Sequence, residues 1–519
     1  MAWLNLGEIL HIHARKHPKK LAVKDWHGKA WTYSELDTRT NKLANGLLNI
    51  GLRKGDRVAV MLYNCVEFVE IYCAFAKIGL VAAPISWRYV DKEIEYVVNN
   101  SDAKAIIVYE DFVKTIDAIR SKLKKVAENK FIAVGKSVPK GYIKYEDLVA
   151  GSSSHKPKID VDSKDAWVQM YTSGTTGVPK GVVRSHESYV AFFLVNAIEF
   201  GFSEKDYGMI VMSLFHVNST FYGLLFLYIG GSLFVGRDKS FDPVELLSIV
   251  DKEKVSFISL IPTHYSLILE VPKETLRRFD TSSLHKLLCS SAPVRSIIKR
   301  GILECFSGVE LYEAYGSTEA GLVTILKPED QLRKIGSMGR ECIGVDLIKL
   351  LDNNGREVGI GEIGELYSRG PMMFDEYYKM LEKTKASFRG EFFSAGDLVR
   401  RDDEGYYYIV DRKDNMIITG GEHVYPSEIE EMISQHPKVR DVAVVGLPDD
   451  KWGEAVTAIV VLRDSENATE EEIIEWCRGK IAGFKKPKKV LFIDYSEMPR
   501  SATGKILHRK LRERYAENL

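Results

Sequence analysis

Along its first part the chain alternates between two hydrophobic patterns, and this alternation restricts the fold more than any other feature. Apolar residues recur at helical spacing over 36–48 and stop at Gly51, where a helix commonly ends. The apolar run 58–62 then predicts a buried strand, a second helical pattern covers 68–76, and another strand-like run follows at 105–108. Helices that alternate with continuous apolar strands usually cover both faces of a parallel sheet. We therefore predict an α/β fold with largely parallel sheets.

The length of the chain indicates more than one domain. At 519 residues it is too long for one simple core. Hydrophobic residues make up 45% and charged residues 28%, which is ordinary for a soluble globular protein. Lys and Arg number 72, and so do Asp and Glu. A nucleic-acid-binding protein usually shows a basic excess, so we expect no nucleic-acid partner.

The pattern changes near residue 411. The polar segment 151–158 reads as a connector, but the segment after 411 reads as a compact α+β unit of its own. We therefore predict a large N-terminal domain over 1–411 and a small C-terminal domain over 412–519. The elements expected in the small domain are helices at 426–433 and 470–481 and strands at 439–445, 455–462 and 490–493.

One uncharged stretch calls for a membrane test. Between Asp206 and Arg237 there is no Asp, Glu, Lys or Arg, and this exceeds the roughly 20 apolar residues of a membrane-spanning helix. Polar residues over 213–220 and the Gly230–Gly231 pair interrupt it, so we predict a buried core segment. The six cysteines show no CxxC pair and lie mostly in apolar runs, which favours buried free thiols in a reducing cytoplasm.

Residues 171–181 (YTSGTTGVPKG) carry the clearest chemical signal. They combine three glycines, four Ser or Thr hydroxyls and Lys180 after an apolar-leaning approach. Glycines let backbone N–H groups close around phosphate oxygens, and hydroxyls add hydrogen-bond donors at little steric cost. The spacing does not fit the Walker A pattern GxxxxGK[ST]. We interpret the segment as a phosphate-binding loop; a flexible Ser/Thr-rich loop is the alternative.

This loop resembles the phosphate-binding signature of the adenylate-forming superfamily, which includes acyl-CoA synthetases, nonribosomal-peptide adenylation domains and firefly luciferases. Four further segments resemble that family in the expected order, so the resemblance covers nearly the whole chain. They are 312–319 (YEAYGSTE), 392–397 (FFSAGD), 411–422 (DRKDNMIITGGE) and 499–505 (PRSATGK).

The resemblance implies a fold and a two-step reaction. The fold would be a large N-terminal domain of mixed and parallel sheets flanked by helices, with a small distorted barrel and a small mobile C-terminal domain. A hinge is expected near Asp414, which matches the family's pivot position. The reaction would join a carboxylic acid to ATP as acyl-AMP, release pyrophosphate, and transfer the acyl group to coenzyme A. ATP, Mg2+ and CoA are the implied cofactors and co-substrates.

The same resemblance assigns nucleotide and metal ligands. Tyr315 matches the residue that stacks on adenine, Asp397 and Arg412 match two ribose contacts, and Glu319 with Thr175 matches the Mg2+ site. Asp397 and Arg412 could instead be ordinary surface ion-pair partners. The full set of expected ATP or AMP contacts is Thr172, Ser173, Gly174, Thr175, Thr176, Gly177, Lys180, Ser291, Ala292, Pro293, Glu313, Ala314, Tyr315, Gly316, Ser317, Thr318, Asp397 and Arg412.

Lys505, His216 and Glu319 are the candidate catalytic residues. Lys505 matches the family lysine that bridges the substrate carboxylate and the α-phosphate, where a compact point charge is useful. Without the motif it would read as one more cation in a basic C-terminal helix. His216 resembles the residue that borders the acyl carboxylate, although a lone His in an apolar run is more often a core residue.

The remaining site residues concern CoA and the acyl group. Gly420, Gly421 and Glu422 resemble the strand that lines the pantetheine tunnel, where larger side chains would obstruct. The expected acyl-pocket residues are His216, Val217, Asn218, Ala314 and Gly316. The stretch 213–223 lacks the Phe-Asp-x-Ser pattern that amino-acid-activating members carry near this point, so a fatty, alicyclic or aromatic acid is expected.

The first hypothesis is therefore an AMP-forming acid–CoA ligase of the cytoplasm, acting on small molecules and without a transmembrane segment. The resemblance leaves a homodimer open. The main alternative is a stand-alone adenylation enzyme that loads a carrier-protein thiol. A luciferase-like oxygenase and a non-catalytic nucleotide sensor share the motifs, but a sensor has little use for Glu319 and Lys505 together.

Overall fold

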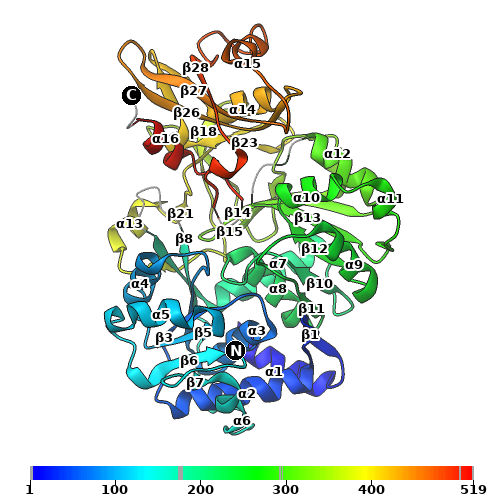
Figure 1. Ribbon diagram of the computed structural model, residues 1–519, viewed down its shortest axis with the longest axis vertical. Helices are drawn as coiled ribbons and strands as arrows, with labels where there is room; N and C mark the ends of the chain where they lie inside the picture. Colours follow the sequence, from blue (N-terminus) through cyan, green and yellow to red (C-terminus); the bar gives the residue numbers. More distant parts are fainter. Residues whose placement is uncertain (1–3, 173–178, 292–293, 295, 502–503, 517–519) are drawn as a thin grey trace.

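A computed structural model describes residues 4–172, 179–291, 294, 296–501 and 504–516. Figure 1 shows the chain after residue 412, mostly in orange and red, above the two large sheets that the preceding residues form. Strands β14 (Glu310–Ser317) and β15 (Gly321–Leu326) lie between the two parts. The fold is mixed α/β with a small C-terminal unit, as predicted.

One sheet holds the strand that leads into the predicted phosphate loop. Its order is β19-β9-β8-β4-β3-β5-β6-β7, and the run from β8 to β7 is parallel. The strands are β3 (Arg57–Met61), β4 (Val81–Pro84), β5 (Ala105–Tyr109), β6 (Phe131–Val134), β7 (Ile143–Lys144), β8 (Ala166–Thr172), β9 (Lys180–Ser185) and β19 (Glu376–Tyr377). The associated helices are α2 (Tyr33–Asn49), α3 (Val66–Ile78), α4 (Asp91–Asn100), α5 (Val113–Ile119) and α6 (Tyr145–Ala150).

These elements confirm the alternation read from the sequence. Helix α2 begins with a capping box in which Thr32 and Glu35 satisfy each other's backbone N–H groups. Helix α3 ends at Gly79, whose φ of 67° is the left-handed conformation that favours glycine at a helix end. The two helices pack against each other.

The second sheet supplies most of the strand ends near the predicted site. Its order is β16-β15-β14-β13-β12-β10-β11-β1-β2, parallel from β14 to β1 with antiparallel strands at both edges. The strands are β1 (Leu21–Asp25), β2 (Ala30–Thr32), β10 (Tyr207–Ile210), β11 (Ser232–Val235), β12 (Phe257–Leu260), β13 (Lys286–Ser290), β14 (Glu310–Ser317), β15 (Gly321–Leu326) and β16 (Arg340–Glu341). The associated helices are α1 (Leu6–Lys16), α7 (His186–Phe200), α8 (Val217–Ile229), α9 (Pro243–Glu253), α10 (Pro262–Leu269), α11 (Lys273–Leu276) and α12 (Ser296–Cys305).

The uncharged stretch forms helix α8 and strands β10 and β11. Every residue of α8 but the last is buried, and the described residues contain no helix long and apolar enough to span a membrane. The prediction of a buried core segment is confirmed. All six cysteines are free; five are buried and Cys305 is partly exposed, as expected.

A small antiparallel sheet precedes the C-terminal unit, and its order is β17-β18-β22-β23. Its strands are β17 (Lys349–Leu351), β18 (Ile363–Tyr367), β22 (Asp397–Arg401) and β23 (Tyr407–Arg412), and the neighbouring elements are α13 (Leu381–Ala386), β20 (Phe388–Arg389) and β21 (Phe392–Phe393).

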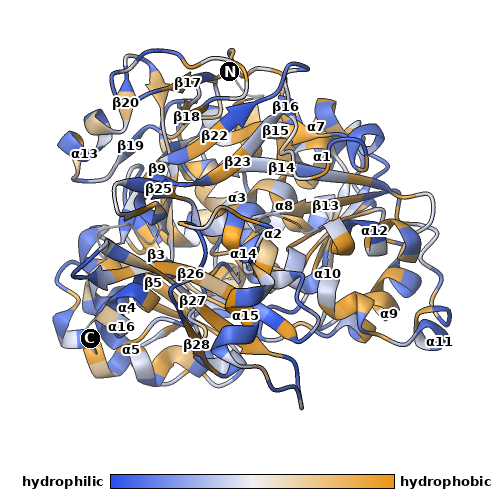
Figure 2. Ribbon diagram, turned by 90° about the horizontal axis from the view of Figure 1, so that it is seen from above, coloured by the Kyte–Doolittle hydropathy of each residue, from blue (hydrophilic) through white to orange (hydrophobic). Residues whose placement is uncertain are grey.

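The C-terminal unit has hydrophobic clusters that contain only residues from 417 onward. Figure 2 shows hydrophobic residues on its long strands β26 and β27, in contrast to outlying hydrophilic helices such as α11 and α13. The division at 411/412 stays a prediction. The elements are β24 (Ile417–Thr419), β25 (Glu422–Val424), α14 (Pro426–Ser434), β26 (Val439–Asp449), β27 (Gly453–Leu462), α15 (Glu470–Trp476), β28 (Lys489–Phe492) and α16 (His508–Ala516).

Candidate functional site

The carboxyl ends of the parallel strands bring predicted segments together. In the β13–β14 pair Ser290 lies opposite Ala314, so the segment after β13 and the end of β14 are neighbours. Ser291 follows with a φ of 70°, a conformation that is uncommon without glycine and often found at functional sites. Ligands of open α/β sheets bind beyond the carboxyl ends of the strands. This edge is therefore the candidate site.

Asp397, Arg412 and Tyr315 form one hydrogen-bonded group. Asp397 on β22 and Arg412 on β23 are directly opposite in the antiparallel register, and Arg412 Nε donates to Asp397 Oδ1 at 2.9 Å. The Tyr315 hydroxyl donates to Asp397 Oδ2 at 2.6 Å. Burial would raise the pKa of Asp397, but the Arg412 charge and these hydrogen bonds hold it below its usual value. Asp397 is therefore a preorganised, charged acceptor.

Lys180 and Glu319 lie next to this group. The Tyr377 hydroxyl donates to Glu319 Oε1 at 2.9 Å, and Lys180 Nζ lies 4.6 Å from the centre of the Tyr377 ring. Burial lowers the pKa of Lys180, while the charge of Glu319 raises it and that of Arg412 lowers it. Lys180 and Arg412 thus place two positive charges near the Glu319 carboxylate, and positive charges of this kind attract phosphate.

Lys505 reaches the same place from the C-terminal unit. It lies on a tight loop in which Gly504 has a φ of 76° and donates its N–H to the Ser501 carbonyl at 2.9 Å. A side chain at Gly504 would lie 3.2 Å from Ile261, so the loop rests on the start of α10. Desolvation and then the charge of Arg412 lower the pKa of Lys505, and Asp397 opposes both effects. Lys505 therefore lies within electrostatic range of the Asp397–Arg412 pair.

The base of the predicted phosphate loop is described, although most of the loop is not. Thr172 and Lys180 pair across β8 and β9, so the loop leaves from the end of this hairpin. The Thr172 hydroxyl is buried and has no hydrogen-bond partner among the described residues, which suits a phosphate oxygen. Seven predicted contacts lie outside the described residues: Ser173, Gly174, Thr175, Thr176, Gly177, Ala292 and Pro293.

The predicted acyl residues surround the start of α8. His216 is the N-cap residue, and its Nδ1 accepts the Asn218 N–H at 3.4 Å. Burial lowers the pKa of His216 to about 4, so its imidazole is neutral near pH 7. Asn218 donates to Ser290 Oγ at 2.9 Å and accepts from Ser259 Oγ at 3.0 Å. Val217 is buried beside them.

The structure explains the glycine at position 316 in a way that the sequence did not suggest. The resemblance implied only that Gly316 borders the nucleotide and the acyl pocket. A Cβ at Gly316 would lie 2.0 Å from the carbonyl oxygen of Gly321, because β14 and β15 pass very close to each other here. The glycine is therefore required by the backbone itself. Ser317 beside it accepts the Ala320 N–H on its hydroxyl at 2.9 Å and so shapes the turn that follows β14.

The predicted CoA residues form a hairpin turn. Gly420 and Gly421 link β24 to β25 with φ values of 58° and 86°, which only glycine adopts at low cost. A Cβ at Gly421 would meet nothing within 4 Å, and Glu422 beside it is exposed. Asp414, the predicted hinge, is exposed in the short 3₁₀ turn Lys413–Asn415 that follows β23.

Several partners were not anticipated from the sequence. Tyr377 is distant from every motif, and only the pairing of β19 with β9 brings it to Glu319. Ser259 joins Asn218 in the same way, through the order of the strands. The side chain of Glu313 forms a buried ion pair with Lys299 of α12. Burial raises the pKa of Glu313, and Lys299 opposes this.

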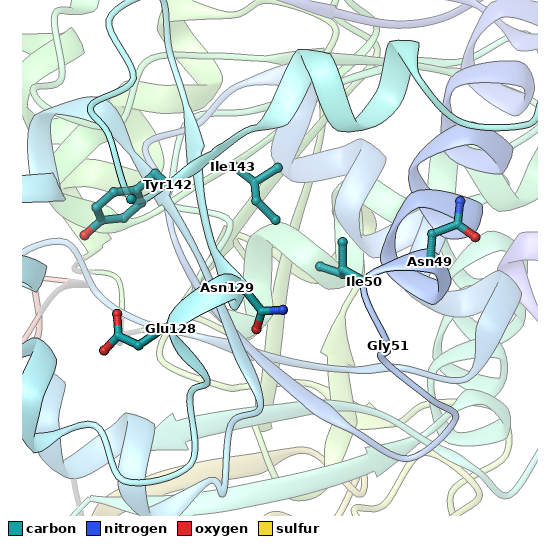
Figure 3. Close-up of a pocket in the computed structure, with 8 residues that line it drawn as sticks. Asn49, Ile50, Gly51, Glu128, Asn129, Tyr142 and Ile143 are labelled. Carbon is teal, nitrogen blue, oxygen red and sulfur yellow. The ribbon is translucent and has the colours of Figure 1, made fainter.

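A depression elsewhere on the surface is not part of this site. It has a volume of about 600 Å³ and lies where α2 ends, beside β6 and β7 (Figure 3). These strands form the edge of their sheet that is opposite to β9 and β19. Its lining residues are Asn49, Ile50, Gly51, Glu128, Asn129, Gly141, Tyr142 and Ile143, and no predicted site residue is among them.

Known proteins share this architecture and sequence. The chain matches the AMP-binding enzyme family over residues 10–378 and the C-terminal domain of AMP-binding enzymes over 428–505. It is 34% identical to the long-chain-fatty-acid–CoA ligase FadD13 of Mycobacterium tuberculosis, over 99% of both chains.

Two solved structures are similar over nearly their whole length. One is the anthranilate CoA ligase AuaEII in complex with anthranoyl-AMP, with a TM-score of 0.90, 28% identity, and coverage of 99% of this chain and 98% of that chain. The other is ATP-bound MatB from Rhodopseudomonas palustris, with a TM-score of 0.88, 31% identity and 99% coverage of both chains.

Proposed function

Because this chain belongs to the AMP-binding enzyme family and is an AMP-forming acid–CoA ligase, we propose how its residues divide two half-reactions between them. In the first, a carboxylate oxygen bonds to the α-phosphorus of ATP and pyrophosphate leaves. In the second, the thiol sulfur of CoA, after losing its proton, bonds to the acyl carbon and AMP leaves. Transfer to a carrier-protein thiol is not favoured, since the relatives are CoA ligases.

One observation carries the assignment of residues: the loop of Lys505, in the C-terminal unit, rests on Ile261 at the start of α10, and the charges of Arg412 and Asp397 act on the lysine. In the first half-reaction two anions must approach each other, so the barrier falls when fixed positive charges neutralise them. Lys505 would contact the carboxylate and the α-phosphate, and Lys180 the outer phosphates. Asp397 would accept hydrogen bonds from the ribose hydroxyls.

Glu319 fits a magnesium ion that travels with ATP. Mg2+ takes oxygen ligands and is usually held by one or two carboxylates together with substrate phosphates. One Glu319 oxygen accepts from Tyr377, which orients the carboxylate and leaves its other oxygen for a cation. When bound, the ion would neutralise charge on the phosphates. Thr175 stays a proposed second contact.

The second half-reaction needs a different position of the C-terminal unit. Lys505 would stand near the route of the incoming thiol, so we expect this unit to rotate about Asp414 after acyl-AMP forms. The exposed turn Lys413–Asn415 can absorb such a rotation with few broken contacts. Gly420 and Gly421 would then line the path of the pantetheine arm.

The substrate would be a fatty, alicyclic or aromatic acid. FadD13 is a fatty-acid–CoA ligase and AuaEII an anthranilate CoA ligase, so relatives of both kinds are known. Asn218, Ser259 and Ser290 add a polar edge to an otherwise apolar and aromatic surrounding. Each buried methylene contributes about 0.8 kcal/mol, so preference for chain length should be graded.

The proposal is tested by a panel of carboxylic acids, with AMP release measured in the presence and absence of CoA. We expect AMP to accumulate with at least one acid, and CoA to increase the rate. Failure of every acid to release AMP would contradict the proposed function, and stimulation only by a phosphopantetheinylated carrier would contradict the choice of CoA. A homodimer and a cytoplasmic location also stay proposals; light scattering of the purified protein tests the first.

A further inference from the structure

Arg184 is a charged side chain in a fully buried position. It lies on β9, on the same face of the strand as Lys180, and none of its surface is exposed. No carboxylate of the described residues lies within ion-pair distance of it. Desolvation lowers the pKa of its guanidinium to about 10, so the group is still charged near pH 7. The charges of Asp375 and Glu319 favour the charged form from a longer distance, but burial of a charge without a directly contacting carboxylate is costly and calls for an explanation.

The guanidinium holds two backbone segments that are far apart in the sequence. Its Nη1 donates to the Thr318 carbonyl at 2.6 Å, and its Nη2 donates to the Met372 carbonyl. The group also lies 4.8 Å from the centre of the Phe221 ring on α8, a favourable contact for a cation. Arg184 therefore connects the acyl-side helix to the turn that follows β14.

That turn carries the proposed magnesium ligand. Thr318 immediately precedes Glu319, whose own carbonyl accepts the Phe374 N–H at 2.7 Å. The Glu319 carboxylate is oriented by Tyr377. The backbone on one side of Glu319 is thus held by Arg184, while Phe374 and Tyr377 hold the residue itself.

We propose that Arg184 is a positioning residue that sets the place of the Thr318–Glu319 backbone, and through it the metal and phosphate geometry. The inference rests on the proposed role of Glu319. Two carbonyls from separate segments need two donors in one rigid plane, which a guanidinium has and an ammonium lacks. A neutral aliphatic side chain would fill the space but leave both carbonyls without their donor.

The test compares Arg184→Lys and Arg184→Leu with the unaltered protein. ATP binding is measured by calorimetry with Mg2+ and with EDTA, without any acid. We expect the gain in ATP affinity due to Mg2+ to fall by about 10- to 100-fold, as for other groups that orient a metal ligand. Adenylation should slow by a similar factor, and transfer to CoA from supplied acyl-AMP should not. If Arg184→Leu does not fold, Arg184→Lys carries the same comparison.

Phe192→Leu is the matched control. Its ring stacks on Phe221 at 3.8 Å, so the change removes buried packing near Arg184 without touching either carbonyl. It should lower the Tm and leave the Mg2+ dependence of ATP binding unaltered. Arg184 variants with unaltered Mg2+ dependence, or with both half-reactions reduced equally, would overturn the inference.

Glu319→Gln separates the two proposals. If Glu319→Gln abolishes the gain in ATP affinity due to Mg2+ and the Arg184 variants leave that gain unaltered, the positioning role of Arg184 is wrong but the role of Glu319 stands. If Glu319→Gln itself leaves the effect of Mg2+ intact, the proposed metal ligand is wrong, and the inference falls with it.

Discussion

Asp397→Asn tests the nucleotide site, and the size of the expected loss in ATP affinity follows from counting hydrogen bonds. An ionised carboxylate offers about four acceptor sites. Arg412 and Tyr315 occupy one on each oxygen, at 2.9 and 2.6 Å. Two sites remain, one per oxygen, which matches the two ribose hydroxyls of ATP. The substitution replaces one carboxylate oxygen by an amide nitrogen, which donates hydrogen bonds and cannot accept them.

The expected loss is therefore at least one hydrogen bond between a ribose hydroxyl and a charged acceptor. Such a bond contributes about 1.5–3 kcal/mol, or about 10- to 150-fold in affinity. We expect Asp397→Asn to weaken ATP binding by about that factor. It should also reduce the preference for ATP over 2′-deoxy-ATP and 3′-deoxy-ATP, because the lost contact is to a ribose hydroxyl.

The assay is calorimetric binding of ATP and the two deoxy nucleotides to both proteins. Tyr315→Phe is the control, because it removes a donor to Asp397 but leaves the carboxylate as an acceptor for ribose. A variant Asp397→Asn that still discriminates ATP from both deoxy nucleotides as the unaltered protein does would refute the ribose assignment.

The lowered pKa of Asp397 predicts that the stability of the protein relative to Asp397→Asn depends on pH. The pKa of Asp397 is lower in the folded protein than the value of about 3.9 for an unfolded chain. Its charged form therefore stabilises the fold above about pH 4, and this contribution is lost as the pH falls through the folded pKa. Asp397→Asn lacks it, so the difference in Tm between the two proteins should shrink below about pH 4. A constant difference would contradict the reasoning.

Three more residues offer tests of the proposed roles. Lys505→Ala should slow adenylation by about 10²- to 10³-fold and spare transfer from supplied acyl-AMP; equal loss of both would contradict two positions of the C-terminal unit. Gly421→Leu should instead slow transfer, and Gly421→Asn, which tolerates a positive φ better, shows how much of the effect is backbone strain. Asn218→Ala removes the hydrogen-bond partner of Ser259 and Ser290, and should move the acid preference toward less polar acids; an unaltered ranking in the acid panel would place Asn218 outside the pocket.

Part of the fold was predictable because its signals are local. The helical spacings over 36–48 and 68–76 and the apolar run 58–62 each depend on neighbouring residues alone. Helices α2 and α3 cover the two helical stretches, and β3 covers residues 58–61 of the run. The helix expected over 470–481 ends earlier, at Trp476, and Gly479 follows with a φ of 72°. Element boundaries depend on such local breaks, which hydrophobic periodicity does not register.

By itself the sequence determined the kind of chemistry. The loop at 171–181 combines glycines, hydroxyls and a lysine as phosphate sites do, and that is a property of the residues, whereas Lys505 was identified only through the family resemblance. Only the tertiary structure decided which side chains act together. The register of β22 and β23 places Asp397 opposite Arg412. The pairing of β9 with β19 brings Tyr377 of β19 beside Glu319. The sequence did not identify Arg184 as a site residue, because its two partners are backbone carbonyls more than a hundred residues away. Every residue has a backbone carbonyl, so residue types do not show which carbonyls act as partners.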